Sequence, residues 1–171
     1  MTITLGSTTP SATQAGGVGR IFTQDVVLAG GTAGNYFTKV RVKVQNGVSA
    51  GPSIAARVLV YSGTTLIDWA PFTIPSQPSP TPVIIETALT GAVPVTNGTY
   101  KIGMQVATAD GTFFITTGTA NTVSTTSTTT YGSAPPNPWT PGTTFSWSLA
   151  VATSPEASTI SVARTLSAAM P

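Results

Sequence analysis

The sequence predicts an all-β fold: a single antiparallel β-sandwich, jelly-roll-like, with an extended arm at each end of the chain. Three observations predict it. Apolar and polar residues alternate with period two in several segments, short turn-forming dipeptides separate these segments, and no window carries apolar residues at helical spacing without intervening Gly, Pro or clustered Thr. The length of 171 residues fits one domain with one hydrophobic core.

The predicted strands follow one another at short spacing. Alternation is clearest in residues 36–45, 53–62, 83–89, 99–107 and 144–151, and residues 111–119 are expected to form a further strand. One parity of each alternating strand is apolar, which predicts the core as Val40, Val42, Val44, Ile54, Ala56, Val58, Val60, Val83, Ile85, Leu89, Tyr100, Ile102, Met104, Val106, Phe145, Trp147 and Leu149. The dipeptides Asn46-Gly47, Ser62-Gly63, Asn97-Gly98 and Asp110-Gly111 predict tight reversals. Antiparallel hairpins are therefore expected.

Residues 121–132, NTVSTTSTTTYG, consist mainly of hydroxyl-bearing residues. Such a run is typical of a glycosylated stalk, a flexible linker or a strand. Because strands are predicted on both sides of it, we expect a strand with Val123 on a shallow buried face, closed by Tyr131 and lying near a sheet edge.

Two proline-rich segments, residues 70–82 and 133–142, are expected to be stiff surface loops that could carry a site. The two ends of the chain hold too few apolar residues to build a core. We therefore divide the chain into an N-terminal arm (residues 1–19), a β-sandwich domain (20–154) and a C-terminal arm (155–171).

Charged residues make up only 7% of the chain, against about 25% in an ordinary soluble domain. Lys39, Arg41 and Lys43 alternate with valines, as on the solvent face of one half-buried strand, so no nucleic-acid partner is expected. The first residues, MTITLGSTTP, lack the pattern of a secretory signal, and no apolar stretch approaches the ~20 residues of a membrane span. Neither export nor membrane insertion is expected.

The absence of histidine and cysteine excludes Ser-His-Asp and Cys-His catalysis and makes a zinc site implausible. The five acidic residues are too dispersed to predict a calcium site or a glycosidase pair: Asp25, Asp68, Glu86, Asp110 and Glu156. The glycine-rich stretches at residues 15–20 and 28–35 lack the lysine and the helix of a phosphate-binding loop. We expect a protein that is not an enzyme and uses no cofactor; an activity lost on Asp68→Asn or Glu86→Gln would contradict this.

Aromatic residues at strand ends or in loops offer a binding alternative. Trp69, Trp139 and Tyr131, together with Tyr36 and Tyr61, could stack on sugar rings. The other interpretation is that Trp69 and Trp139 fill the ends of the sandwich under the proline-rich loops.

The succession FTKVRVKVQNG, AARVLVYSG and VTNGTYKIGMQVA resembles the jelly-roll modules that recur in phage virion proteins and in some carbohydrate-binding domains. The resemblance covers roughly residues 20–151 and matches no functional residue. It implies a non-enzymatic virion structural protein, of the capsid-decoration or head or tail accessory type in a tailed phage. The alternative is a carbohydrate-binding or receptor-recognising module.

The virion hypothesis implies specific partners and contacts. The partners would be copies of the chain itself and a major capsid or tail protein, with a surface glycan in the alternative. Such a protein would be made in the host cytoplasm and located in the virion. The expected assembly contacts are the apolar residues of the two arms, which could add a strand to a neighbouring sheet: Ile3, Leu5, Ile160, Val162 and Leu166.

Overall fold

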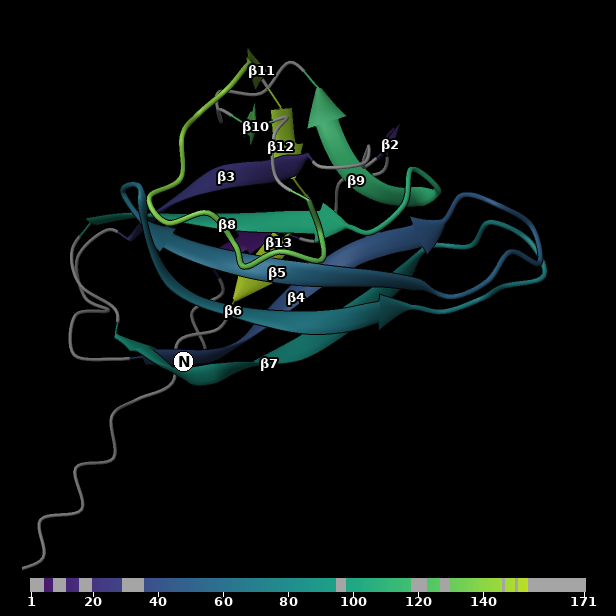
Figure 1. Ribbon diagram of the computed structural model, residues 1–171, viewed down its shortest axis with the longest axis horizontal. Helices are drawn as coiled ribbons and strands as arrows, with labels where there is room; N and C mark the ends of the chain where they lie inside the picture. The colour runs from purple at the N-terminus through teal and green to yellow at the C-terminus, as the bar shows by residue number, and fades with distance from the viewer. Residues whose placement is uncertain are drawn as a thin grey trace, which may run out of the picture.

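A computed structural model describes residues 5–7, 12–15, 20–28, 36–94, 98–117, 123–126, 130–145, 147–149 and 151–153. Within these residues the chain forms strands, turns and loops, and no helix. Two antiparallel sheets pack against each other (Figure 1). The prediction of an all-β sandwich is confirmed.

Thirteen strands are described. They are β1 (Leu5–Ser7), β2 (Ala12–Ala15), β3 (Ile21–Leu28), β4 (Tyr36–Asn46), β5 (Ile54–Ser62), β6 (Thr65–Ile74), β7 (Val83–Pro94), β8 (Gly98–Val106), β9 (Gly111–Thr117), β10 (Val123–Thr126), β11 (Thr144–Phe145), β12 (Trp147–Leu149) and β13 (Val151–Thr153). The five alternating segments all contain strands, but the segment expected at 144–151 forms three short ones.

One sheet has six strands in the order β11-β10-β3-β8-β5-β6. The other has seven: β1-β13-β4-β9-β12 form a path, β7 pairs with the remaining edge of β4, and β2 pairs with β9. Most consecutive strands lie in different sheets; the exceptions are β1 and β2, β5 and β6, β10 and β11, and β12 and β13, whose two members share a sheet. This repeated crossing ties the two sheets together.

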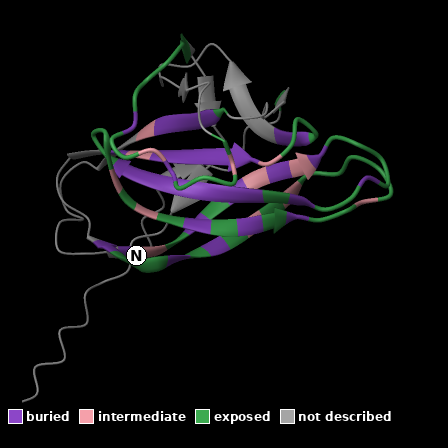
Figure 2. Cartoon of the chain, viewed as in Figure 1, coloured by how far each residue is buried: buried purple, intermediate pink, exposed green. Residues whose placement is uncertain are grey.

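The main core lies between the sheets. It contains the predicted residues of β4, β5 and β8, together with Leu89 of β7, and β5 is buried along most of its length (Figure 2). Val83 and Ile85 are partly buried against this core. Phe22, Phe37 and Phe72 also belong to it, although the alternation did not single them out. The side chains of Phe145, Trp147 and Leu149 lie outside the described residues.

The outer face of β4 is charged, as the alternation predicted. Lys39 Nζ and Arg41 Nε lie 3.0 and 2.8 Å from the two carboxylate oxygens of Glu86 on the neighbouring strand β7. Lys43 follows on the same face and is half-buried. Lys39, Arg41 and Glu86 thus form a small ion-pair network on the surface of the seven-stranded sheet.

Two of the predicted turns lie side by side. The backbone N–H of Gly47 donates to the carbonyl of Asp110 at 2.8 Å, and a Cβ atom at position 47 would lie only 2.9 Å from that oxygen. Glycine is therefore required at position 47. In the turn after β5, Gly63 has φ near +60°, which also favours glycine.

The threonine-rich run contributes a short strand, β10, between β11 and β3. Val123 and Ser124 pair with both neighbours, whereas among the described residues Thr125 and Thr126 pair only with β3. This half of β10 borders the sheet edge, as expected. Tyr131 does not close the strand, because it lies in the turn that follows.

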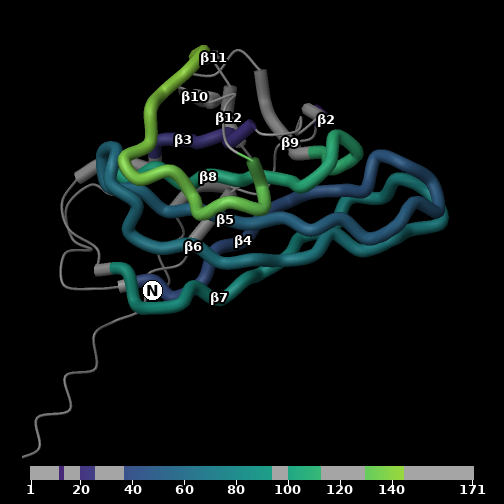
Figure 3. Tube along the Cα trace, viewed as in Figure 1, coloured from purple at the N-terminus to yellow at the C-terminus, as the bar shows by residue number. Residues whose placement is uncertain are grey.

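The expectation of two proline-rich loops is half right. Residues 70–74 belong to β6, where Pro71 pairs in register with Arg57 of β5. A proline is tolerated there because β6 is the last strand of its sheet, so its missing N–H removes no bond to a further strand. Residues 133–142 do form a loop, and this loop crosses the sheet face formed by β5 and β8 (Figure 3).

The N-terminal segment, expected as an arm, contributes strands to the domain itself. β1 pairs with β13, and β2 pairs with β9, both antiparallel. Leu5 therefore lies opposite Thr153 of the same chain. Ile3 and the C-terminal segment 155–171, with Ile160, Val162 and Leu166, lie outside the described residues.

Candidate binding site

The segment of residues 130–143 covers part of the outer face of the six-stranded sheet. Its backbone is attached at several points: the N–H of Trp139 donates to the carbonyl of Thr64 at 2.8 Å, and the hydroxyl of Tyr61 donates to the carbonyl of Pro136 at 3.2 Å. The side chain of Trp139 is 1% exposed and packs with Ile21, Leu59 and Tyr61 in a second, smaller hydrophobic cluster. Both faces of this part of the sheet are therefore covered.

Arg57 lies on this covered face, in the middle of β5. Although arginine is rarely buried, it is only 3% exposed. Its Nε donates to the side-chain oxygen of Gln105 on β8 at 2.7 Å, and its Nη1 donates to the carbonyl of Ser133 at 2.8 Å. The remaining nitrogen, Nη2, is buried and has no hydrogen-bond partner within the described part of the chain. The guanidinium is therefore only partly satisfied.

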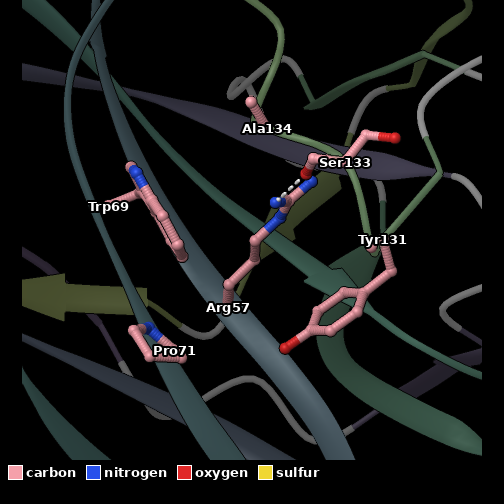
Figure 4. Close-up of a pocket in the computed structure, with 7 residues that line it drawn as sticks. Arg57, Trp69, Pro71, Tyr131, Ser133 and Ala134 are labelled. Carbon is pink, nitrogen blue, oxygen red and sulfur yellow. Dashed lines mark hydrogen bonds between the residues drawn. The ribbon is translucent and has the colours of Figure 1, made fainter.

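Two aromatic rings flank the guanidinium (Figure 4). The Cζ atom of Arg57 lies 5.8 Å from the ring centre of Trp69 on β6 and 5.3 Å from that of Tyr131 in the covering segment. The hydroxyl of Tyr131 donates to the carbonyl of Ala56 at 2.9 Å, which fixes this ring against β5. Both distances are within the range of cation–π attraction.

A pocket of about 390 Å³ opens at this position. Its walls are Arg57, Trp69, Pro71 and residues 131–134. Trp69 is 37% exposed, so part of its ring faces solvent at the pocket. The pocket thus combines an accessible aromatic surface with a buried cation.

Burial controls the protonation of the groups on this face. It lowers the pKa of the Arg57 guanidinium, which nevertheless remains a cation at neutral pH because the pKa of arginine is so high. Burial also raises the pKa of the Tyr61 hydroxyl to about 12 and raises that of Tyr131, and in both cases the nearby charge of Arg57 opposes the shift. At neutral pH the site holds one positive charge and two neutral phenols.

The structure brings together two of the three aromatic residues proposed as glycan contacts. Trp69 and Tyr131 line the same pocket, on either side of Arg57. Trp139 does not: its ring is buried against Tyr61, with ring centres 5.9 Å apart, and is not open to a ligand. The other interpretation, that both tryptophans fill the ends of the sandwich, is right only in that Trp139 is buried. Trp139 lies within the proline-rich loop and packs on the outer face of the six-stranded sheet, and Trp69 is partly exposed.

The acidic residues considered for catalysis make structural contacts. Asp68 accepts hydrogen bonds from the hydroxyl of Thr90 and from the backbone N–H of Trp69 and Gly91, and so links β6 to β7. Glu86 is paired with the cations of β4. Across the described ranges, no three acidic residues gather as a metal site would require. In the same ranges, no helix is long and apolar enough to cross a membrane.

The alternation did not single out Arg57 or its partner Gln105. The sequence nevertheless indicates that the outer face of β5 is covered. The alternate residues of β5 that are expected to face solvent include Leu59 and Tyr61 as well as Arg57. Two large apolar residues on a supposedly exposed face indicate that something covers it. What covers it could not be inferred, since Ser133 lies 76 residues further along the chain.

No protein-family model matches this chain, and no curated protein matches it either. The functional conclusions therefore rest on the residues of the chain itself.

Proposed function

We propose that this chain is a non-enzymatic structural protein of a virion, of the capsid-decoration or head or tail accessory type of a tailed phage. It would bind a symmetric lattice formed by a major capsid or tail protein and by copies of itself. The observation that carries the proposal is the small amount of charge left on the molecular surface.

Several of the few charges in the described part are paired within the molecule. Lys39 and Arg41 both pair with Glu86, and Lys101 pairs with Asp25. A protein that stays free in solution depends on surface charge to avoid association. A lattice subunit does not, because its neighbours cover its faces. The exposed apolar side chains Val48, Ile67 and Ile84 are consistent with such coverage.

Attachment would come from many weak contacts that the lattice symmetry repeats, so that avidity replaces a strong single site. The N-terminal segment contributes little to this argument, because β1 and β2 pair within the chain. The C-terminal segment 155–171 remains the candidate attachment arm.

The test is cosedimentation with particles produced by the genome that encodes this chain. We expect the full-length protein to sediment with capsids or with tails at a fixed copy number. Deletion of residues 156–171 removes no described strand, so the truncated protein should keep its melting temperature and lose its place in the particle. Deletion of residues 1–19 is the contrasting variant: it removes β1 and β2 and should lower stability. Absence of the full-length chain from all particles would contradict the proposal.

The pocket favours a second candidate, a carbohydrate-binding or receptor-recognising module. Trp69 presents part of its ring beside Tyr131, an arrangement in which a sugar ring can stack. On a glycan array, Trp69→Ala should then abolish sugar binding without loss of folding. The matched control is Ile67→Ala, an exposed residue of the same strand that does not line the pocket.

A further inference from the structure

Arg57 is a buried cation without an acidic partner in the described parts of the chain. Its two hydrogen-bond acceptors, the Gln105 amide oxygen and the Ser133 carbonyl, are both uncharged. Three acidic side chains are engaged elsewhere: Asp25 with Lys101, Asp68 with Thr90 and Gly91, and Glu86 with Lys39 and Arg41. A buried charge is costly unless it is paired, so a partially satisfied arginine is expected where a ligand completes its bonding.

The unpartnered nitrogen determines the kind of ligand. A guanidinium offers N–H groups in one plane, which suits the two oxygens of a carboxylate. Nη1 already donates to a carbonyl, and Nη2 is free to donate to an added acceptor. The ligand group that fits is therefore a small oxyanion, and a carboxylate would place one of its two oxygens on Nη2.

The walls of the pocket determine what carries the carboxylate. The accessible surface of Trp69 is flat and apolar, and Pro71 continues this surface along β6. The C–H face of a sugar ring packs on such a surface. A volume of about 390 Å³ lies near the lower end of the roughly 300–1,000 Å³ of small-molecule sites, which suits one sugar unit.

We propose that this pocket binds an acidic sugar residue, with its carboxylate on Arg57 and its ring against Trp69. The proposal rests on the glycan-binding candidate described above and specifies its ligand. Nη2 has no exposed surface, so the carboxylate reaches it when the turn at residues 131–133 moves outward. A Cβ atom at Gly132 would meet no atom within 4 Å, so the turn is open on that side. The movement breaks the hydrogen bonds from Arg57 to the Ser133 carbonyl and from Tyr131 to the Ala56 carbonyl, and the bond to the carboxylate replaces the first of them.

The experiment is a titration of the full-length protein with glucuronate, galacturonate and N-acetylneuraminate, followed by amide chemical shifts. Glucose and galactose are the matched neutral sugars. We expect at least one acid to bind at least about tenfold more tightly than the neutral sugars, since hydrogen bonds to a charged group are stronger than those between neutral groups. The amides of residues 131–134 should shift, and those of residues 83–86 on the other sheet should not.

Two variants locate the ligand. Trp69→Ala removes an exposed ring and should weaken binding of the acid about tenfold or more, while Ile67→Ala should leave binding unchanged. Arg57→Met should abolish the preference for acids over neutral sugars. Because Arg57 is buried, the melting curve of this variant must first show that it folds; Trp69→Ala keeps the test decisive if it does not.

The outcomes separate this inference from the proposals on which it depends. Equal binding of glucuronate and glucose in the pocket would overturn the carboxylate assignment and leave a glycan-binding module. Binding of benzoate or acetate as tight as that of the uronates would overturn the assignment to a sugar. Binding of none of the three acids would overturn the inference, while cosedimentation with particles would still decide the lattice proposal independently.

Discussion

An arginine lies on the outer face of each sheet, and the two arginines differ in their exposure to solvent and in the charge of their hydrogen-bond partners. On the seven-stranded sheet, the Arg41 side chain is 49% exposed and donates to the carboxylate of Glu86 at 2.8 Å. On the six-stranded sheet, Arg57 is 3% exposed and donates only to uncharged oxygens. One cation is in water with a counter-ion, and the other is buried with none among the described residues.

This difference does not arise in the strands themselves. β4 and β5 both alternate, and in both strands one parity faces the core between the sheets. The difference arises because residues 130–143 cross only one of the two outer faces. Covering that face creates a second hydrophobic cluster around Trp139, and it also removes Arg57 from water. The same segment therefore stabilises the fold by burying apolar side chains and destabilises it by removing the charge of Arg57 from water.

The largest predicted effect contrasts the two faces of β5. Val58 is completely buried between the sheets, whereas Ala55 is exposed on the outer face. Val58→Asp should abolish folding, because a buried unpaired carboxylate costs several kcal/mol against a total stability of about 5–15 kcal/mol. Ala55→Asp should fold normally. Circular dichroism and thermal melting measure both, and the reverse result would mean that the strand register is shifted by one residue.

The covered face should lose stability at alkaline pH. Burial raises the pKa of Tyr61 from 10.0 to about 12, so the folded protein keeps a proton that the unfolded chain releases. The stability is complete below pH 10 and is lost as the pH rises toward 12, by roughly 2–3 kcal/mol at about 1.4 kcal/mol per pH unit. Denaturant titrations at pH 9 and above measure the loss.

Tyr61→Phe is the control for this alkaline loss. The phenylalanine keeps the ring against Trp139 and removes the ionisable hydroxyl, so most of the pH dependence should disappear. Some should remain, because the pKa of Tyr131 is raised by burial as well. An unchanged alkaline slope in the variant would show that another group is responsible.

A smaller effect separates the two arginines. Arg57→Met removes two hydrogen bonds and leaves the buried Gln105 side chain without one of its donors, but it also relieves the cost of burying a charge. We expect a net loss of roughly 1–2 kcal/mol in the free energy of unfolding. Arg41→Met should change it little, since exposed ion pairs contribute little. A stabilised Arg57→Met protein would indicate that the cation is retained for binding at the expense of stability.

The fold could be predicted because local patterns determine it. Alternation located β4, β5, β7 and β8, and the glycines of two turns are required by close approach or positive φ. The sequence predicts a loop at Pro71, because proline fixes an extended shape without an N–H to pair. Pro71 nevertheless lies in β6, because β6 is the last strand of its sheet and no further strand needs an N–H from it. The sequence of one segment does not show whether its strand will lie at the edge of a sheet.

The candidate site could be predicted only in part. Trp69 and Tyr131 are candidates because they are aromatic residues expected at strand ends or in loops, and the structure places them around one pocket. Arg57 was missed because its surroundings come from β6, β8 and a loop more than 70 residues away. Period-two alternation shows that a strand has an apolar face and an opposite face. It does not show which distant segment, if any, covers the opposite face.

The smallest predicted effect belongs to the exposed face and to acid pH. Hydrogen bonds from Arg41, and then from Lys39, lower the pKa of Glu86 below its usual value, so the folded protein releases this proton more readily than the unfolded chain does. The resulting stability is present above the unfolded pKa of about 4.3 and is lost as the pH falls through the lower, folded value. Because the Glu86 side chain lies on the exposed face, water and salt screen the interaction, and Glu86→Gln should reduce the acid slope only slightly. The slope should also shrink in 1 M salt, whereas the alkaline loss from Tyr61 should persist there, because burial causes it. Equal salt sensitivity of the two slopes would mean that the two outer faces do not differ in the way their burial indicates.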